Sequence, residues 1–531
     1  MKSTAATPAR PAADPSPRLD RDRIARLIGR AAVAPGRPTS PARSPLDGRV
    51  LGDVPHGQPA DVEAAIARAR HIQDTWAHQT PEERARIFVR FHDLVLERQD
   101  EVLDLIQLES GKARKHAFEE VADTALVARY YSLRAAELLA PVRRRGVIPG
   151  LTLVYEHHQP KGVVAMIAPW NYPLTLSASE AVPALLAGNA VVMKPDRHTP
   201  LTALWGLEIL EQAGLPPGLL QIVTGEGAVL APSLIAGSDY VSFTGSVATG
   251  RPGAAEAGRH LIGCSLELGG KNPMIVLPDA DLDRAVDGAI RGCFSSAGQL
   301  CISFERLFVH ETIYHRFLEH FVAATQALRL GAGLDWDVDM GSLVSGNQLE
   351  KTAAHVDDAV RHGATLEAGG KARPDLGPYF FEPTILSGVT PAMKVYAEET
   401  FGPVVSIYRF SSINQAVEHA NESPYGLNAS VWTGDTDLGR RIAERLRCGT
   451  VNVNEAYAAA WGSVDAPMGG FKDSGLGRRH GAEGLLKYTE AQTIAIQRVA
   501  PIAPPLGIED ETFSRFFTKT LRLLRYVPGL R

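Results

Sequence analysis

Short apolar runs alternate with helical segments from residue 162 onward, and this alternation constrains the fold more than any other feature. The runs are GVVAMIAP (162–169), AVVMKP (190–195), LLQIVTGE (219–226), YVSFTG (240–245) and PMIVL (273–277). They are nearly continuous in apolar residues, which is typical of strands buried on both faces. Buried strands separated by helices predict a parallel, doubly wound α/β sheet, and we expect all five runs to belong to it.

A second series of the same kind follows the first. It comprises RLFVH (306–310), a helix expected over 314–330, PVVSIYRF (403–410), LNASVWTG (427–434) and GTVNVN (449–454). A chain of 531 residues is also too long for one hydrophobic core. We therefore predict two α/β lobes, with a ligand cleft near their junction.

Other segments are expected to frame these lobes. Residues 60–139 look helical, and TPEE supplies Thr80 as N-cap, a proline in the first turn and Glu83 for a capping box. The runs GLTLVYEHHQP (150–160) and TEAQTIAIQRVA (489–500) read as strands. We expect them to pair in a small projecting sheet, whose open edge favours a homodimer or homotetramer.

Composition excludes several classes of protein. The first 18 residues are rich in Ala and Pro and predict a disordered leader without a signal peptide. Four cysteines are too few for a disulfide scaffold and fit the cytoplasm. A net charge of −5 gives no electrostatic reason to expect nucleic-acid binding.

The C-terminal segment, residues 501–531, carries an amphipathic pattern. Its apolar helical face is surrounded by basic residues, and that face consists of Phe513, Phe516, Phe517, Leu521, Leu524 and Val527. We expect this helix to pack on its own protein or on a neighbouring subunit. The alternative is weak contact with an acidic membrane surface.

Three short stretches carry candidate chemistry, and each alone also has an ordinary structural explanation. Cys301 in GQLCIS is either a small buried hydrophobe or a nucleophile. Glu267 in SLELGGKNP is either the ion-pair partner of Lys271 or a base whose pKa is raised by burial. Asn171 in APWNYP follows the first buried strand, where it serves as a turn residue or as an oxyanion donor.

Two glycine-bearing loops predict a nucleotide. TGEGAVLA (224–231) and FTGSVATG (243–250) each lie between a strand and a helix, where free backbone N–H groups attract phosphate. No metal site is predicted. The DADLD stretch (279–283) lacks the glycine of a calcium loop, and three histidines spaced by five residues do not share a helical face.

Six motifs in order resemble the aldehyde dehydrogenase superfamily: PWNYP, MKP, FTGS, LELGGKNP, GQLCIS and EETFGPVVS, over roughly residues 43–499. The resemblance implies a Rossmann-type cofactor domain, a catalytic thiol domain and a small β extension for oligomerisation. We accordingly expect five parts: a dinucleotide-binding domain over 19–146 and 161–290, a catalytic domain over 291–487, oligomerisation strands over 147–160 and 488–500, the leader and the tail.

The same resemblance implies an enzyme mechanism. Cys301 would attack an aldehyde, and Asn171 with the Cys301 backbone N–H would hold the oxyanion. After hydride transfer to NAD(P), Glu267 would activate water to hydrolyse the thioester and release a carboxylic acid. The presence of Glu267 implies that water rather than coenzyme A takes the acyl group.

The implied cofactor residues surround this centre. Lys194 would bind the adenine ribose, Ser246 the pyrophosphate and Glu399 the nicotinamide ribose, with Phe401 beside the ring. The remaining residues of the implied cofactor site are Trp170, Arg197, Gly225, Gly245 and Leu268. Arg197 stands where NAD-preferring members commonly carry glutamate, and an arginine there attracts a 2′-phosphate. NADP is therefore the preferred cofactor, with NAD as the alternative.

Longer segments resemble an actinobacterial group of NADP-type succinate-semialdehyde dehydrogenases, namely KPDRHTP, GQLCISFER, NVNEAYAAAWGS and PPLGI. The implied reaction is oxidation of succinate semialdehyde to succinate, whose carboxylate needs a cation such as Arg306. Tyr457 and Trp461 instead suggest an apolar entrance, and hence a broad aliphatic or aromatic aldehyde dehydrogenase. A non-catalytic binding or structural relative is disfavoured because all three catalytic residues are present.

Overall fold

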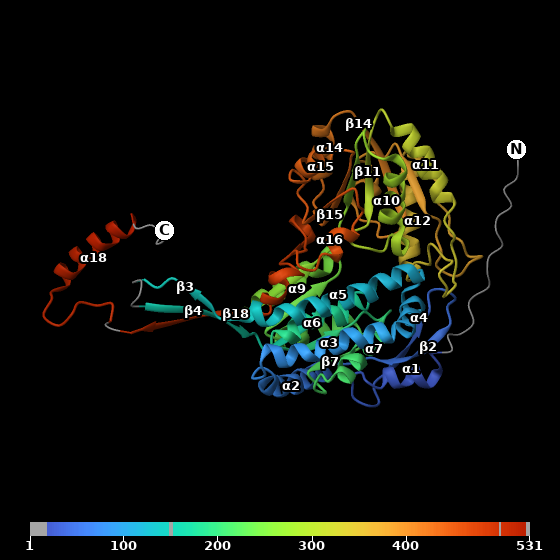
Figure 1. The fold of residues 1–531 in the computed structure, drawn as a ribbon. Helices are drawn as coiled ribbons and strands as arrows, with labels where there is room; N and C mark the ends of the chain where they lie inside the picture. Colours follow the sequence, from blue (N-terminus) through green and yellow to red (C-terminus); the bar gives the residue numbers. More distant parts are fainter. Residues whose placement is uncertain (1–17, 148–151, 499–500, 527–531) are drawn as a thin grey trace, which may run out of the picture. The chain divides into compact units, whose positions relative to one another are not determined.

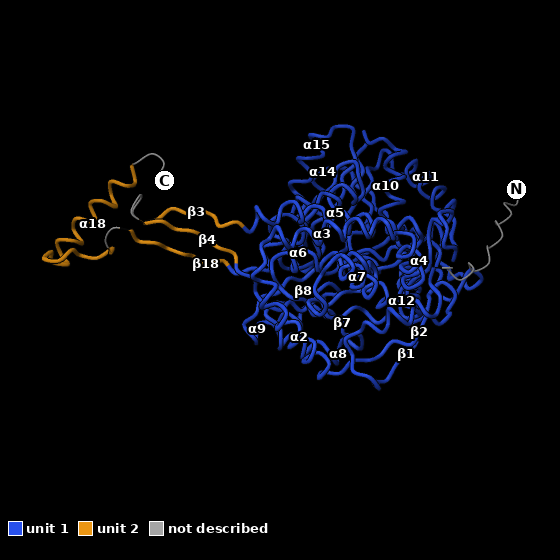
Figure 2. Tube along the Cα trace, turned by 60° about the horizontal axis from the view of Figure 1, so that its bottom comes forward, with its two compact units in different colours: residues 1–139, 159–490 blue, residues 140–158, 491–531 orange. Residues whose placement is uncertain are grey.

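The computed structural model describes residues 18–147, 152–498 and 501–526, so the leader expected over 1–18 lies, apart from Arg18, outside the described residues. The chain divides into two compact units, one of residues 1–139 and 159–490 and the other of residues 140–158 and 491–531 (Figure 2).

The first unit contains a six-stranded sheet with the strand order β17-β9-β8-β5-β6-β7 (Figure 1). Its pairings are parallel except for β17 on β9. The strands are β5 (Val163–Ile167), β6 (Ala190–Lys194), β7 (Leu220–Ile222), β8 (Tyr240–Thr244), β9 (Gly263–Glu267) and β17 (Gly475–Leu476). Helices that contact it are α2 (Pro59–Trp76), α6 (Glu180–Leu186), α7 (Pro200–Ala213), α8 (Gly227–Gly237) and α9 (Val247–Arg259).

A seven-stranded sheet in the same unit has the order β12-β13-β14-β11-β10-β15-β16, parallel except for β12. Its strands are β10 (Asn272–Val276), β11 (Phe304–His310), β12 (Thr365–Ala368), β13 (Thr384–Ser387), β14 (Val404–Phe410), β15 (Asn428–Trp432) and β16 (Thr450–Val453). Helices from this part of the chain are α10 (Leu282–Phe294), α11 (Tyr314–Gln326), α12 (Gly346–Arg361), α13 (Lys394–Ala397), α14 (Ile413–Asn421), α15 (Thr436–Ala443) and α16 (Ala458–Gly462).

The two predicted sheets are confirmed, but the expected place of PMIVL is wrong. This run is β10, which pairs with β11 and β15 in the seven-stranded sheet. The change of sheet therefore falls between Glu267 and Asn272 rather than at residue 290. The helix expected over 314–330 also ends earlier, at Gln326.

Four helices precede the sheets, as predicted for residues 60–139: α2, α3 (Pro81–Glu97), α4 (Gln99–Ser110) and α5 (Arg114–Leu139). The capping box is confirmed, because Thr80 Oγ1 accepts from the Glu83 N–H at 3.2 Å and Glu83 returns a bond to the Thr80 N–H at 2.8 Å. Shorter elements complete the unit: α1 (Arg21–Ile28), β1 (Thr39–Arg43), β2 (Val50–Pro55), α17 (Gly481–Leu486), and the single turns η1 (Thr175–Ser179), η2 (Ser295–Gly298) and η3 (Lys472–Ser474).

The second unit holds a three-stranded sheet and one helix. The sheet has the order β18-β4-β3, from β3 (Val142–Arg144), β4 (Thr152–Pro160) and β18 (Thr489–Gln497), which confirms the predicted pairing. The predicted amphipathic helix is α18 (Asp510–Leu524), where the rings of Phe513 and Phe517 stack at 5.7 Å. Val527 of its predicted face lies outside the described residues.

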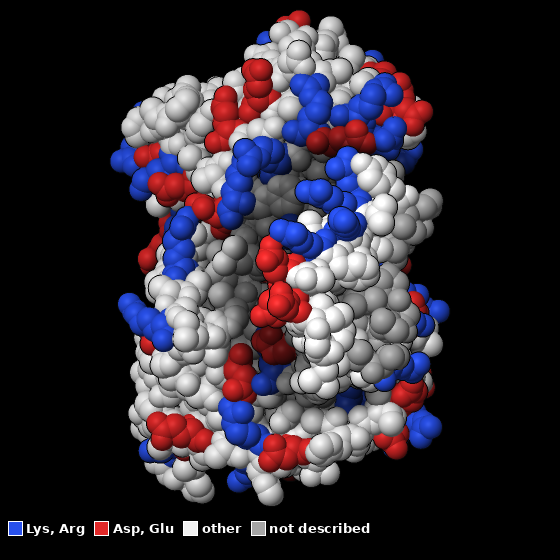
Figure 3. Space-filling model, turned by 90° about the vertical axis from the view of Figure 1, so that its left-hand side faces the viewer, with Lys and Arg blue, Asp and Glu red and all other residues white. Residues whose placement is uncertain are grey.

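The surface charge and the hydropathy of the helices can also be described. Lys and Arg side chains are interspersed with Asp and Glu on the face drawn in Figure 3. Within the described ranges, no helix combines the length and the apolar character needed to cross a bilayer.

Candidate active site

The three predicted catalytic side chains, Cys301, Glu267 and Asn171, line one cavity. Asn171 lies on the loop that follows β5, Glu267 ends β9, and Cys301 precedes β11. Strands β5 and β9 are parallel members of one sheet, so their carboxyl ends meet at the edge where ligands bind in such folds. The cavity also includes six of the predicted cofactor residues: Trp170, Gly245, Ser246, Leu268, Glu399 and Phe401.

Cys301 occupies a tight turn. Its carbonyl oxygen accepts a hydrogen bond from Asn272 Nδ2 at 2.7 Å. Ser296 and Ala297, just before it, adopt left-handed backbone angles (φ 53° and 55°), a conformation that non-glycine residues hold only where the surroundings impose it. Burial, followed by the nearby carboxyls of Glu267 and Glu399, raises the pKa of the Cys301 thiol to about 12. The thiol therefore needs a base to ionise at neutral pH.

Glu267 has the environment of a base. Burial raises its pKa to about 7, and its Oε1 atom is buried without a hydrogen-bond partner among the described residues. The alternative ion pair with Lys271 is wrong, because Lys271 Nζ bonds Glu305 and the carbonyl oxygen of Glu398 instead. Glu267 is thus free to exchange a proton with a group in the cavity.

Asn171 is buried and held from two directions. Its Nδ2 atom donates to the Gln299 carbonyl at 3.1 Å, next to the turn that carries Cys301. Its backbone carbonyl accepts from Lys112 Nζ at 2.5 Å. The side-chain amide therefore lies where it can donate to an oxygen on a carbon attached to the thiol.

The cofactor wall, which consists of Lys194, Ser246, Glu399 and Phe401, fits a dinucleotide. Ser246 caps α9, so the free N–H groups of that helix face the site expected for a pyrophosphate. The Lys194 side chain is buried, and its Nζ atom makes no hydrogen bond or ion pair among the described residues. Burial lowers the pKa of this amine. An otherwise unpartnered buried amine suits a ribose hydroxyl.

Glu399 and Phe401 form the other end of this wall. Glu399 Oε1 accepts from the Gly270 N–H at 2.7 Å, and burial with the nearby Glu305 raises the Glu399 pKa to about 7. An added Cβ on Gly269 would lie 2.5 Å from Glu399 Oε2, so the Glu399 carboxylate would have to shift. The Phe401 ring meets Trp170 edge-on at 5.5 Å.

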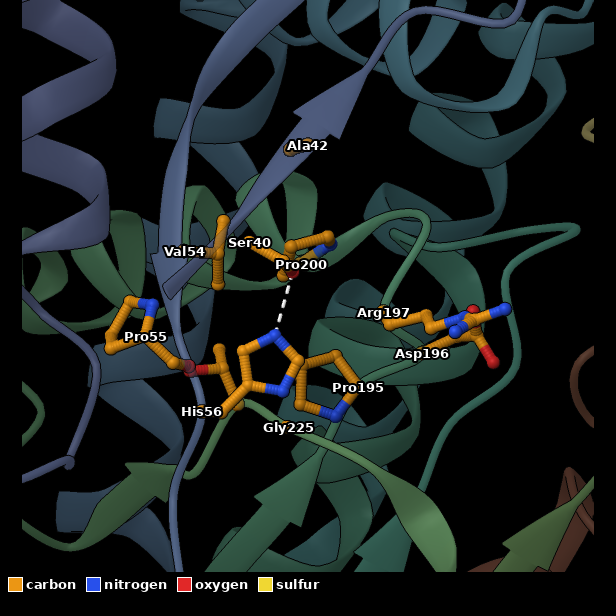
Figure 4. A pocket seen from close by; sticks show the side chains of 11 residues that line it. Ser40, Ala42, Val54, Pro55, His56, Pro195, Asp196, Arg197, Pro200 and Gly225 are labelled. Carbon is orange, nitrogen blue, oxygen red and sulfur yellow. Dashed lines mark hydrogen bonds between the residues drawn. The ribbon is translucent and has the colours of Figure 1, made fainter. Parts of the chain in front are cut away.

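Arg197 and Gly225 line a smaller pocket together with Pro195 and Asp196, which follow β6 (Figure 4). Figure 4 shows Arg197 on one side and His56 on the other, with His56 Nε2 bonded to Ser40 Oγ at 2.6 Å. The Arg197 side chain is 55% exposed, and its Nη1 atom lies 3.2 Å from Glu226 Oε1. It is a cation at the surface that already has an acidic neighbour.

The predicted role of Arg306 is wrong. Its guanidinium is buried on β11 and donates to three backbone carbonyls, those of Lys271, His419 and Ala420, at 2.9–3.0 Å. Because these bonds occupy the guanidinium, the side chain is not available to a substrate.

Tyr457 contacts two residues that line a second cavity, and neither Tyr457 nor Trp461 lines the cavity of Cys301. The Tyr457 hydroxyl bonds Glu119 and Ser295, both at 2.8 Å, and these two residues line that cavity. The Trp461 ring lies 6.1 Å from the ring of Tyr172, the neighbour of Asn171. Their place in an apolar entrance therefore stays a prediction.

Sequence reasoning missed several supporting residues. Gln299 bonds Val344, Ser296 and Ser342 and so fixes the turn before Cys301; its place in GQLC was the available signal. Gln348 and Lys351 line the cavity from α12. Gly298 lies against another part of the chain: an added Cβ would be 2.1 Å from the Gly402 carbonyl oxygen.

Comparison with known proteins agrees with this arrangement. A model of the "Aldehyde dehydrogenase family" matches residues 33–494. A protein of Mycolicibacterium smegmatis named "Putative succinate-semialdehyde dehydrogenase [NADP(+)]" is 51% identical over 493 residues, which are 93% of this chain and 95% of that protein.

Two solved structures share the fold. Betaine aldehyde dehydrogenase from Staphylococcus aureus in complex with NAD+ has a TM-score of 0.85 at 32% identity, covering 90% of this chain and 97% of that one. An E. coli NADP-dependent enzyme has a TM-score of 0.85 at 34% identity, covering 89% and 99%. Because the family match spans most of the sequence, the chain belongs to the aldehyde dehydrogenase family and is an NAD(P)-dependent oxidoreductase of aldehydes.

Proposed function

We propose that this enzyme oxidises succinate semialdehyde to succinate with NADP, using Cys301 as nucleophile, Asn171 as oxyanion donor and Glu267 as base. The observation that carries the proposal is that these three side chains share one cavity with Glu399 and Phe401. A nicotinamide bound there supplies the hydride acceptor.

The chemistry follows from the groups present. Glu267, with its pKa near 7, accepts the proton of the Cys301 thiol, whose own pKa is far higher. The thiolate sulfur bonds to the aldehyde carbon while Asn171 Nδ2 steadies the oxygen. Loss of hydride to the bound nicotinamide would leave a thioester on Cys301. Glu267 passes the thiol proton to solvent and then takes a proton from the water that attacks the thioester, and that proton returns to the departing Cys301 sulfur. Acid and free thiol are released.

The preference for NADP depends on Arg197. Its guanidinium is the cation nearest in sequence to the ribose-binding Lys194, and a 2′-phosphate can replace Glu226 as its partner. The M. smegmatis relative and the E. coli structure are both named for NADP, whereas the S. aureus structure holds NAD+.

The substrate proposal depends on the names of the relatives at 51% identity. With Arg306 occupied, candidate cations for the substrate carboxylate include Lys351, which lines the cavity of Cys301. Others are Lys115 and Arg291 of the second cavity, paired with Asp339 at 3.0 Å and Glu455 at 3.5 Å. The aromatic group of Tyr172, Tyr457 and Trp461 favours a second candidate, a broad aliphatic or aromatic aldehyde dehydrogenase.

A substrate panel run with NAD and NADP in parallel separates these candidates. We expect the highest kcat/KM for succinate semialdehyde with NADP, and no turnover from the Cys301→Ala variant. A higher value for hexanal or benzaldehyde would select the broad enzyme, and absence of turnover with every pair would indicate a non-catalytic relative.

We also propose that the chain assembles as a homodimer or homotetramer through β18 and acts in the cytoplasm, where its four free cysteines stay reduced. We assign the apolar face of α18 to contact with a protein surface. Co-sedimentation with anionic liposomes that is lost on deleting residues 509–531 would instead support membrane contact.

A further inference from the structure

Two buried lysine–glutamate pairs of the same design hold two loops of the cavity. In each pair the lysine donates to a backbone carbonyl of a loop, and the glutamate accepts N–H groups from residues two to four positions further along that loop. We refer to Lys112–Glu120 as the oxyanion clamp and to Lys271–Glu305 as the cofactor clamp.

The oxyanion clamp holds the loop after β5. Lys112 Nζ donates to Glu120 Oε1 at 2.7 Å and to the Asn171 carbonyl at 2.5 Å. Glu120 Oε2 accepts from the N–H groups of Leu174 and Thr175, at 2.7 and 3.2 Å. Both charged side chains are 0% exposed. The loop is therefore held at Asn171 itself and again three and four positions after it.

The cofactor clamp holds the loop between α13 and β14. Lys271 Nζ bonds Glu305 and donates to the Glu398 carbonyl at 2.7 Å. Glu305 accepts from the N–H groups of Thr400 and Phe401 at 2.9–3.0 Å. The two side chains are 1% and 4% exposed. Glu399 lies between the bonded residues Glu398 and Thr400, whereas in the other loop Asn171 is itself bonded through its carbonyl.

Stability alone does not explain two such pairs. Burying an ion pair costs desolvation that its attraction scarcely repays, and well-packed apolar residues often serve as well. Here the charges also satisfy backbone groups of irregular loops, which have no sheet or helix to supply those bonds. Site residues need this support, because an error of about 1 Å in their placement is enough to lose activity.

We propose that the oxyanion clamp positions Asn171 for the chemical steps and that the cofactor clamp positions Glu399 and Phe401 for the dinucleotide, so that the two functions can be impaired separately. The inference rests on the proposed roles of Asn171, Cys301 and Glu399. The four clamp residues are positioning residues and do not touch the substrate.

Paired neutral replacements test the proposal without leaving an unpaired buried charge. The variants are Lys112→Met/Glu120→Gln and Lys271→Met/Glu305→Gln, in which glutamine keeps an oxygen for the loop N–H groups. The matched control is Arg23→Met/Glu208→Gln, a pair 10% exposed on α1 and α7, outside the cavity. Each protein is assayed for NADPH dissociation constant, kcat at saturating substrates and alkylation of Cys301 by iodoacetamide.

We expect a split between the two clamps. The oxyanion-clamp variant should bind NADPH within about twofold of the parent and alkylate at the parent rate, while kcat falls by up to roughly 10²–10³, the range for an oxyanion donor. The cofactor-clamp variant should raise the NADPH dissociation constant at least tenfold with a smaller fall in kcat. The control should change neither constant.

The proposal would be overturned if both variants lost NADPH affinity and kcat to the same extent, or if neither variant lost either. If a double variant fails to fold, as judged by near-ultraviolet circular dichroism, Lys112→Gln/Glu120→Gln and Lys271→Gln/Glu305→Gln carry the same expected split, because they leave no unpaired charge and glutamine can donate to the loop carbonyl. Failure of the proposed function is seen separately, as turnover that persists in Cys301→Ala.

Discussion

The acid–base balance of single residues sets the order of events in the cavity. Burial raises the pKa of Cys301, Glu267 and Glu399 together, so the site disfavours negative charge at all three. Only Glu267 and Glu399, near 7, lose a proton readily at neutral pH. Glu399 is engaged by the Gly270 N–H, whereas Glu267 Oε1 is unpartnered, so Glu267 is the better proton acceptor.

Replacement of Glu267 tests this assignment. In Glu267→Gln we expect the steady-state rate to fall roughly 10²–10⁴-fold, the usual contribution of a general base, because the thioester is no longer hydrolysed. Because Glu267 also accepts the proton of the Cys301 thiol, the first turnover of reduced cofactor should slow as well, measured by stopped-flow absorbance at 340 nm. In the parent, the base is the carboxylate, so deacylation should accelerate as pH rises through about 7 and slow below it. A variant with unchanged pH dependence and rate would contradict the role of Glu267.

We also expect the choice between NADP and NAD to depend on one residue, Arg197. In Arg197→Glu we expect kcat/KM with NADP to fall roughly 10–100-fold, because a charge-assisted bond worth about 1.5–3 kcal/mol is replaced by repulsion. Activity with NAD should stay near the parent value, since the 2′-hydroxyl carries no charge. Arg197→Lys serves as the control that keeps the charge. Equal losses with both cofactors would place Arg197 outside the 2′-phosphate site.

At the level of elements, the sequence predicted features that depend on nearby residues, but it did not predict contacts between residues far apart in the chain. The capping box at Thr80 depends on residues three positions apart, and it formed as predicted. The apolar run of β10 indicates that both faces of the strand are buried, but it does not indicate to which of the two sheets the strand belongs. Lys271 lies four positions from Glu267 yet bonds Glu305, 34 positions away, and Arg306 follows the nucleophile yet lies on a strand that turns it toward backbone carbonyls.

The candidate site was predictable for a different reason. Cys301, Glu267 and Asn171 each have an ordinary structural explanation, and only the order of six motifs and the family resemblance joined them. The clamp residues carried no such signal, because lysine and glutamate side chains are usually exposed to solvent. Their burial becomes visible only in three dimensions.

The turn η2 provides a prediction at the scale of an element. Gly298 has φ +70°, and an added Cβ would lie 2.1 Å from the Gly402 carbonyl oxygen, on the loop of Glu399 and Phe401. Gly298→Ala should therefore lower the free energy of unfolding by about 1–3 kcal/mol and weaken NADPH binding. Urea denaturation and fluorescence titration measure these two effects. Gly258→Ala on α9, with open space around it, is the control and should be neutral or slightly stabilising. An unaltered Gly298→Ala protein would show that the close approach does not hold the loop.

For the whole molecule, the described chain leaves β18 paired only with β4, so its other edge is open. Ile494 and Ile496 lie two positions apart and share a face of this strand, with 37% and 47% of their surface exposed. Charge placed on such a face opposes edge-to-edge pairing and burial against another copy. We therefore expect Ile494→Lys/Ile496→Lys to reduce the assembly to a smaller species, measured by size-exclusion chromatography with light scattering. Val89→Lys on α3, where Val89 is also 47% exposed, controls for the added charge and should leave the mass unchanged. If the double variant keeps the parent mass, the subunits join through another surface and β18 is not the interface.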